Sequence, residues 1–250
     1  MLTRTFLHIS GVGAKRELSI WRAGIESWSD FLARGEDLLP PGLYRLGRRT
    51  AAASLEALER PDGLADLAAM IPPAEHWRFY PHYKKAVYLD IESGGDPQEW
   101  GGITVVGLYD GRRTTQYTAD RNLAEVNHCL RGYEIVVTFG GKSFDLPMLR
   151  KAFPGIYIPP VHIDLRWALA RLGYRGGLKR IERRLNLTRP PSVRDLSGWD
   201  AVRLWREHLE GRRQALPLLL EYNAYDAVNL APLLELSVRE LRRGLLARAG

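Results

Sequence analysis

The chain has 250 residues, of which 45% are hydrophobic and 26% charged, so it can bury a core as one large domain or as a domain with an appendage. The formal net charge of +7 favours nucleic acid or another phosphate-rich partner, although scattered surface arginines on a basic protein would give the same charge. The single cysteine, Cys129, excludes an intramolecular disulfide and a zinc site made of cysteines.

The first part of the chain is predicted to be a small helical region. The run from Ile9 to Gly13 is typical of a tight turn, and an amphipathic helix is expected from there to about Ala23. Further helices are expected over residues 29–33, 49–59 and 63–70, with a break in the chain at 39–42. Because Ile71-Pro72-Pro73 ends this pattern, we expect an N-terminal region over residues 1–72 and a main domain over 73–250.

The main domain is predicted to combine strands and helices. Strands are expected over residues 86–91, 103–108, 114–117, 134–139 and 162–165. Helices are expected over residues 122–130 and 144–153, and everything after Arg166 is helical in character. The turn at Asp110-Gly111 predicts a hairpin between the second and third strands. This order of elements is typical of an α/β or α+β layered domain.

Two acidic residues stand in the first strand. Asp90 and Glu92 are two positions apart, so their side chains share one face of the strand. Such a pair is common in sequences, but in a central strand two like charges this close cannot both be ionised unless a cation accompanies them.

A third acid, Asp145, follows the turn from Gly140 to Ser143, where a buried strand gives way to a helix. Ligands in α/β proteins commonly bind at this edge of the sheet. An acid that only favours the helix N-terminus is the alternative explanation.

The last acid and a tyrosine lie in the C-terminal helical part. Tyr222 and Asp226 are four positions apart and therefore share a helix face. The helix is rich in leucine, so a core role for Tyr222 is the alternative, whereas a buried aspartate is harder to explain that way. Pro232 is expected to kink or restart the helix just after Asp226.

Metal-assisted hydrolysis of phosphodiesters would explain the whole set. Carboxylate oxygens suit Mg²⁺ or Mn²⁺, and two such ions can activate water and stabilise both the attacking and the leaving oxygen. The tyrosine hydroxyl could orient the water or the phosphate.

These residues, in this order, resemble the DEDDy 3′–5′ exonucleases of the ribonuclease H-like superfamily, over about residues 76–236. The resemblance rests on Asp90-x-Glu92, Phe144-Asp145 and Tyr222-x-x-x-Asp226. The chain also resembles a prokaryotic subgroup of uncharacterised ribonuclease H-like proteins, in the run Gly177-Leu178-Lys179 among others. It implies a mixed five-stranded sheet flanked by helices. It also implies that two ions of Mg²⁺ or Mn²⁺ are bound by Asp90, Glu92, Asp145 and Asp226, with Tyr222 assisting the water as the fifth catalytic residue.

One departure from the family concerns the second motif. An asparagine usually precedes its glycine, whereas this chain has Gly140. Substrate positioning there is expected to differ, and metal binding is not affected. Two other polar residues, His162 and Asp164, are interpreted as structural, and a position near the substrate path is the alternative.

The N-terminal turn resembles a helix-hairpin-helix element, although only about eight residues precede it. In such elements backbone N–H groups after a glycine-rich turn bind phosphate. A hairpin that only packs is the alternative here. The candidate nucleic-acid-binding residues are Gly11, Gly13, Lys142, Lys179 and Arg180. For the basic helix that carries Lys179 and Arg180, a face that is only solvated is the alternative.

The resulting expectation is a metal-dependent exonuclease that acts on single strands or 3′ ends and uses no nucleotide cofactor. A structure-selective endonuclease and a non-catalytic nucleic-acid-binding protein are the alternatives, and the sequence leaves both DNA versus RNA and the oligomeric state open. No apolar run reaches the ~18 residues of a membrane span and the first residues lack a signal peptide. We therefore expect a cytoplasmic protein with no membrane partner.

Overall fold

The computed structural model describes residues 1–249 and contains two compact units. One unit comprises residues 1–84 together with the C-terminal segment from Val238, and the other comprises Lys85–Ser237. The domain boundary expected after residue 72 remains a prediction.

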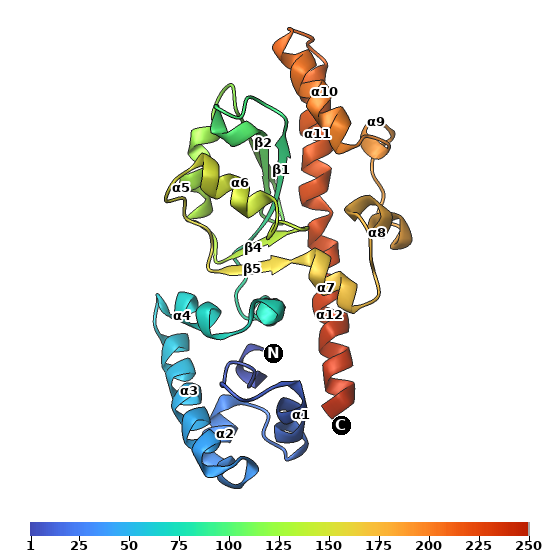
Figure 1. Ribbon diagram of the computed structural model, residues 1–250. Helices are drawn as coiled ribbons and strands as arrows, with labels where there is room; N and C mark the ends of the chain where they lie inside the picture. Colours follow the sequence, from blue (N-terminus) through green and yellow to red (C-terminus); the bar gives the residue numbers. More distant parts are fainter. Residues whose placement is uncertain (250) are drawn as a thin grey trace. The chain divides into compact units, whose positions relative to one another are not determined.

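The larger unit contains a mixed five-stranded sheet, which confirms the α/β fold class (Figure 1). Its strand order is β3-β2-β1-β4-β5. Strand β1 is antiparallel to β2 and parallel to β4, β2 is antiparallel to β3, and β4 is parallel to β5. The strand bounds are Ala86–Ser93 for β1, Ile103–Tyr109 for β2, Thr114–Thr118 for β3, Ile135–Thr138 for β4 and Val161–Asp164 for β5.

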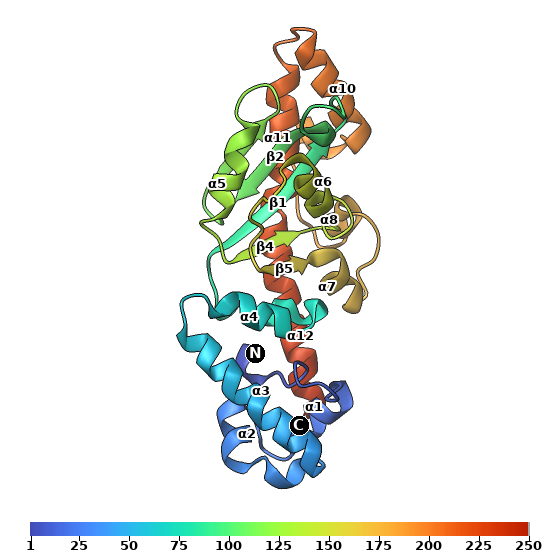
Figure 2. The same cartoon turned by 60° about the vertical axis from the view of Figure 1, so that its left-hand side comes forward.

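The two faces of the sheet bury different sets of apolar residues. Val87, Leu89 and Ile91 of β1 pack with α5 (Val126–Leu130) and α6 (Asp145–Ala152). The opposite face is covered by α11 (Ala215–Val228), which contacts β1, β2 and β3 and runs beside the sheet in both ribbon views (Figures 1 and 2). Because side chains alternate along a strand, Asp90 and Glu92 face α11, while their apolar neighbours face the opposite side.

The C-terminal part of the chain is helical, as predicted. A break between α11 and α12 confirms the expected effect of Pro232, which lies in the first turn of α12, where its missing N–H leaves no helical hydrogen bond unmade. The remaining helices here are α7 (Leu165–Arg171), α8 (Leu178–Arg184), α9 (Pro191–Arg194), α10 (Gly198–Leu209) and α12 (Leu230–Ala249). Short 3-10 turns at Trp100–Gly102 and Leu123–Glu125 complete the unit.

The N-terminal unit is helical. Its α-helices are α1 (Ala14–Arg22), α2 (Trp28–Arg34), α3 (Pro41–Glu59) and α4 (Gly63–Met70), with 3-10 turns at Leu2–Arg4, Glu36–Leu38 and Pro73–Arg78. The chain is interrupted at residues 39 and 40, as expected, but the expectations that the break extends to residue 42 and that the next helix begins near Arg49 were wrong. Helix α3 begins at Pro41, because proline is favoured in the first turn of a helix, where no N–H donor is needed.

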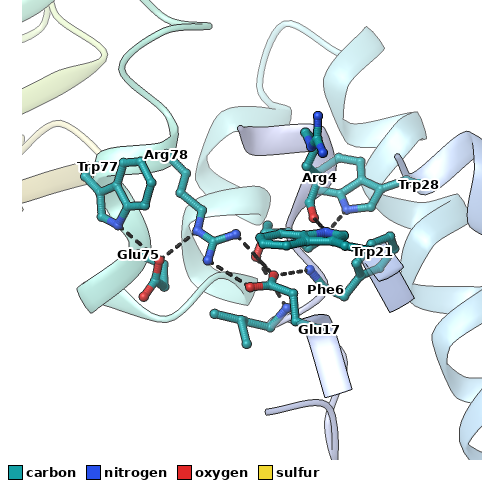
Figure 3. A network of polar contacts seen from close by, with 10 residues as sticks. Arg4, Phe6, Glu17, Trp21, Trp28, Glu75, Trp77 and Arg78 are labelled. Atoms are coloured by element: carbon teal, nitrogen blue, oxygen red, sulfur yellow. Dashed lines mark hydrogen bonds and ion pairs between the residues drawn. The ribbon is translucent and has the colours of Figure 1, made fainter. Parts of the chain in front are cut away.

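A buried ion-pair network ties distant parts of this unit together (Figure 3). Glu17 of α1 accepts hydrogen bonds from the Phe6 backbone N–H at 2.8 Å and from Arg78 Nη1 and Nη2 at 3.1 and 2.9 Å. Arg78 also donates to Glu75 at 2.7 Å and is 1% exposed. Since each charge has a partner, neither Glu17 nor Arg78 is an uncompensated buried ion.

The glycine-rich turn before α1 has the predicted conformation. Gly11 has φ +87°, a backbone region that favours glycine, and the Val12 N–H donates to the Ile9 carbonyl at 2.8 Å. Only a 3-10 turn at Leu2–Arg4 precedes it, as expected from the short N-terminal run. Phosphate binding by Gly11 and Gly13 stays a prediction.

None of the helices over residues 1–249 combines the length and the apolar character that crossing a bilayer requires.

Candidate metal centre and cleft

The acidic pair of β1 lies at the middle of the sheet. Opposite Asp90 in β2 stands Gly107, and opposite Glu92 stands Val105. Asp90 is half-buried and Glu92 is 7% exposed. The central strand therefore carries both carboxylates on the face that α11 covers, as the alternation of the sequence predicted.

Helix α11 brings Tyr222 and Asp226 to this face. Both are buried, and Asp226 lies in the last turn of the helix, before the break at Asn229. One carboxylate oxygen from each of Asp90, Glu92 and Asp226 lies within 4.8 Å of the others. Two segments more than a hundred positions apart in the chain thus form one group of three carboxylates.

Burial in this group disfavours the charged form of each acid. Burial, with the charge of Asp226 second, raises the pKa of Glu92 to about 8 and raises that of Asp90 as well. Burial also raises the pKa of Asp226, while the Arg189 guanidinium acts in the opposite direction. Within the described residues, Glu92 Oε1 is buried and has no hydrogen-bond partner. Three clustered carboxylates with one unmatched acceptor are a donor set that fits a hard divalent cation.

Asp145 is the first residue of α6 and is 5% exposed. It lies outside the group of three, but its charge contributes to the raised pKa of both Asp90 and Glu92. Burial, which is the largest cause, raises its own pKa to about 7. The structure therefore brings all four predicted acids into one electrostatic cluster.

The turn before Asp145 is held by Asp164 at the end of β5. The Asp164 carboxylate accepts hydrogen bonds from the backbone N–H groups of Gly140 at 2.7 Å and Lys142 at 3.2 Å. Gly140 has φ +83°, a conformation that glycine and asparagine adopt more readily than other residues. The backbone of the turn is therefore compatible with glycine as well as with the asparagine of the family pattern, and Asp164 holds this turn through its carboxylate.

Asn223, which follows Tyr222, supports Asp90 from α11. Its side-chain nitrogen donates to Asp90 Oδ2 at 3.0 Å, and its oxygen accepts from Gln116 Nε2 at 3.0 Å. A Cβ at Gly107 would lie 2.1 Å from Asn223 Oδ1, so only glycine at this position leaves room for the amide. No role was expected for Asn223, although an amide next to Tyr222 in a leucine-rich helix could have indicated one.

Gly107→Ala should therefore displace the Asn223 amide from Asp90. We expect divalent-metal affinity to fall by about 10–100-fold, the usual cost of losing a group that orients a metal ligand. Crowding should destabilise the fold by about 1–3 kcal/mol. Isothermal titration with Mn²⁺ measures the first effect and urea unfolding the second.

Two further variants isolate the contact. Asn223→Ala should weaken Mn²⁺ binding to a similar extent. The double variant Gly107→Ala/Asn223→Ala should bind Mn²⁺ as tightly as Asn223→Ala does, because the same contact is already lost. Gly132→Ala, whose Cβ would meet only the Cys129 carbonyl oxygen at 3.5 Å, is the matched control. Equal Mn²⁺ affinity in Gly107→Ala and the control would contradict the role of Asn223.

Arg189 is a second residue for which no role was expected from the sequence. It lies before two prolines, outside any helix, and is 6% exposed. Its Nη2 donates to Asp226 Oδ1, and its Nε and Nη2 donate to Glu182 at 2.8 and 2.6 Å. Glu182 Oε1 also accepts from Asn229 Nδ2 at 2.9 Å. No periodic pattern marks an arginine in an irregular segment, so only the folded chain identifies this contact.

A cleft of about 990 Å³ opens onto the acids. Asp90, Tyr222 and Asp226 line it together with Lys179 and Arg180 of α8. Lys179 Nζ lies 4.4 Å from the centre of the Tyr222 ring. Two of the five predicted nucleic-acid-binding residues thus face the same cleft as the acids.

Further basic residues line this cleft. The other basic residues that line it are Arg183, Arg189 and Arg194. Trp199 follows the lining residue Gly198 and is 85% exposed. Lys142 is exposed in the turn before Asp145. A cleft with acids at one side and basic residues along its wall can hold a polyanion if cations neutralise the acids.

Comparison with protein families matches residues 87–238, more than half of the chain, to a model of the RNase H superfamily. Comparison with curated proteins and with solved structures gives no match. RNase H-like nucleases use divalent metals and act on nucleic acids, in agreement with the acidic cluster. The five-stranded mixed sheet and the matched residues together show that this chain belongs to the RNase H superfamily.

Proposed function

We propose that this protein is a metal-dependent 3′–5′ exonuclease that hydrolyses phosphodiester bonds at the ends of DNA or RNA strands. The observation that carries the proposal is the group formed by Asp90, Glu92 and Asp226, with Tyr222 one helical turn from Asp226 and Asp145 close by. In the third acidic motif along the chain, a tyrosine precedes the aspartate, as in the DEDDy branch.

Asp90, Glu92 and Asp226, with Asp145 beside them, would hold two ions of Mg²⁺ or Mn²⁺. When bound, such ions activate water and stabilise the charge that develops on the phosphoryl oxygens. The protein supplies the buried acids, the orientation of Asp90 by Asn223 and a cleft with basic walls.

Tyr222 is a hydrogen-bond donor in this proposal. Burial, with the negative charges of Asp226 and Glu92 next, raises the pKa of its hydroxyl above the ordinary value. The hydroxyl therefore stays protonated at neutral pH, so it can orient a water molecule or a phosphate oxygen but cannot act as the base.

Basic and aromatic groups around the cleft support an unpaired strand as substrate. Lys179 and Arg180 lie on its wall and provide charges for the phosphates. The exposed Trp199 at the start of α10 provides a surface on which a base can stack, whatever its identity. Lys142 is proposed to contact the strand near Asp145, and Gly11 and Gly13 are proposed to bind phosphate through the glycine-rich turn of the N-terminal unit.

The test uses single-stranded DNA and RNA with Mn²⁺. A strand labelled at its 5′ end should yield a ladder of shortening products, and a circle of the same sequence should stay intact. Cleavage of the circle would instead indicate an endonuclease, and no cleavage of either substrate would indicate a binding protein. Release of mononucleotides from a strand labelled at its 3′ end checks the polarity.

Asp145→Ala should abolish this cleavage and leave the fold intact. Loss of one acid next to the metal ligands is expected to lower the rate by at least about 100-fold, because even groups that only support a ligand contribute 10–100-fold. Circular dichroism checks the fold, and Glu125→Ala, an exposed acid of the same unit, is the control. Retained cleavage in Asp145→Ala would overturn the assignment of the site.

A further inference from the structure

Arg189 forms the centre of a buried polar chain that ends on Asp226. The chain runs from Asn229 through Glu182 and Arg189 to Asp226, and all four residues are at most 7% exposed. They come from α8, from the segment that follows it and from the end of α11. The carboxylate of Asp226 is thus anchored to two other parts of the same unit.

The geometry suits orientation better than charge compensation alone. A planar guanidinium holds two acids at fixed angles, and here it donates twice to Glu182 and once to Asp226. Only one of the two Asp226 oxygens is used by Arg189, which leaves the other for a cation. Asn229 in turn fixes Glu182 at 2.9 Å, so the guanidinium cannot rotate freely.

We propose that Arg189 is a positioning residue: with Glu182 and Asn229 it holds Asp226 in the orientation that binds a divalent cation together with Asp90 and Glu92. The inference rests on the proposed function, because it assigns a role towards the metal of that site. The proposed role predicts that Arg189 raises the affinity for a cation, which is the opposite of what its charge alone would do. A nearby positive charge by itself weakens cation binding, whereas a positioning residue strengthens it.

The decisive variant removes Arg189 and its counter-ion together. In Glu182→Gln/Arg189→Met the local net charge is unchanged and no uncompensated buried carboxylate remains at Glu182. Mn²⁺ binding to the full-length, metal-free protein is measured by the electron paramagnetic resonance signal of free Mn²⁺. We expect affinity about 10–100-fold below wild type. Near-ultraviolet circular dichroism and melting in EDTA check that the variant is folded.

A matched control removes the same residue types elsewhere. Arg203 and Glu207 form an ion pair at 2.8 Å on α10, with Arg203 side-chain exposure of 52%. Arg203→Met/Glu207→Gln should bind Mn²⁺ as wild type does, because an exposed pair contributes little. Arg189→Lys keeps the charge but loses the planar fork, so it should bind Mn²⁺ more weakly than wild type.

The outcomes separate this inference from the proposed function. If wild type binds Mn²⁺ and Glu182→Gln/Arg189→Met binds it equally or more tightly, the positioning role is refuted and the nuclease proposal stands. If wild type binds no Mn²⁺, both fail. Weaker binding in the double variant and in Arg189→Lys, with unchanged binding in the control, supports the positioning role whether or not cleavage has been detected.

Discussion

Replacing Glu92 by glutamine will raise the melting temperature of the metal-free protein at pH 9 while it removes nuclease activity. The pKa of Glu92 is about 8 in the folded protein, because of burial and the charge of Asp226, against an ordinary value of 4.5. A carboxyl group with a raised folded-state pKa favours folding below its unfolded value and loses that contribution as the pH rises through about 8. At pH 9 the wild type therefore carries a buried charge that glutamine lacks.

The expected gain is several °C. Each unit of pKa difference corresponds to about 1.4 kcal/mol, and 1 kcal/mol shifts the melting temperature of a chain this size by about 2–4 °C. The gain should shrink towards pH 5, where Glu92 is protonated in the folded wild type. Calorimetry in EDTA at both pH values measures it, with the exposed Glu125→Gln as the control.

Adding Mn²⁺ should reverse the order of the two proteins. The metal stabilises the wild type by an amount that grows with the ratio of free Mn²⁺ to its Kd, whereas Glu92→Gln has lost a ligand and gains little. If Glu92→Gln melts at or below the wild-type temperature at pH 9 in EDTA, the buried charge of Glu92 does not destabilise the metal-free protein.

Arg78→Met is expected to destabilise the N-terminal unit by about 3–5 kcal/mol, because it leaves Glu17 as an uncompensated charge in the interior. Glu17 is 1% exposed, and its remaining partners are the Phe6 N–H at 2.8 Å and the Thr5 hydroxyl at 3.0 Å (Figure 3). Urea unfolding followed by tryptophan fluorescence measures the change, since Trp21 and Trp28 lie in this unit.

The double variant Glu17→Gln/Arg78→Met completes the cycle. Glutamine keeps an oxygen that can accept from Phe6 and Thr5, so we expect most of the lost stability to return. The control Arg203→Met/Glu207→Gln removes a surface ion pair whose arginine is 52% exposed, and it should change stability by at most about 1 kcal/mol. A loss of about 1 kcal/mol or less in Arg78→Met would show that the buried pair is not what fixes α1 to the turn at residues 73–78.

Local patterns predicted most of the elements of this fold correctly. The five strands were predicted from apolar and β-branched runs, and the hairpin at Asp110-Gly111 from its turn residues. The one clear error, the start of α3 at Pro41, arose because a pair of prolines can both interrupt a chain and begin a helix. Which of the two occurs depends on what the following turn packs against.

In the candidate metal centre, too, some features could be predicted from local spacing and others could not. The period of a strand places Asp90 and Glu92 on one face, and the period of a helix places Tyr222 and Asp226 on another, so these positions follow from spacing alone. That the two faces meet is a result of packing α11 on β1 and β2. The sequence could suggest this meeting only through its resemblance to a family.

Spacings of two to four residues were enough to predict the class of fold and the acids that need a cation. How those acids are held became visible only in the folded chain. Gly107 makes room for Asn223 on Asp90, and Arg189, which also binds Glu182, reaches Asp226 across 37 positions of chain. Such contacts depend on the distance between folded segments, which no local period specifies.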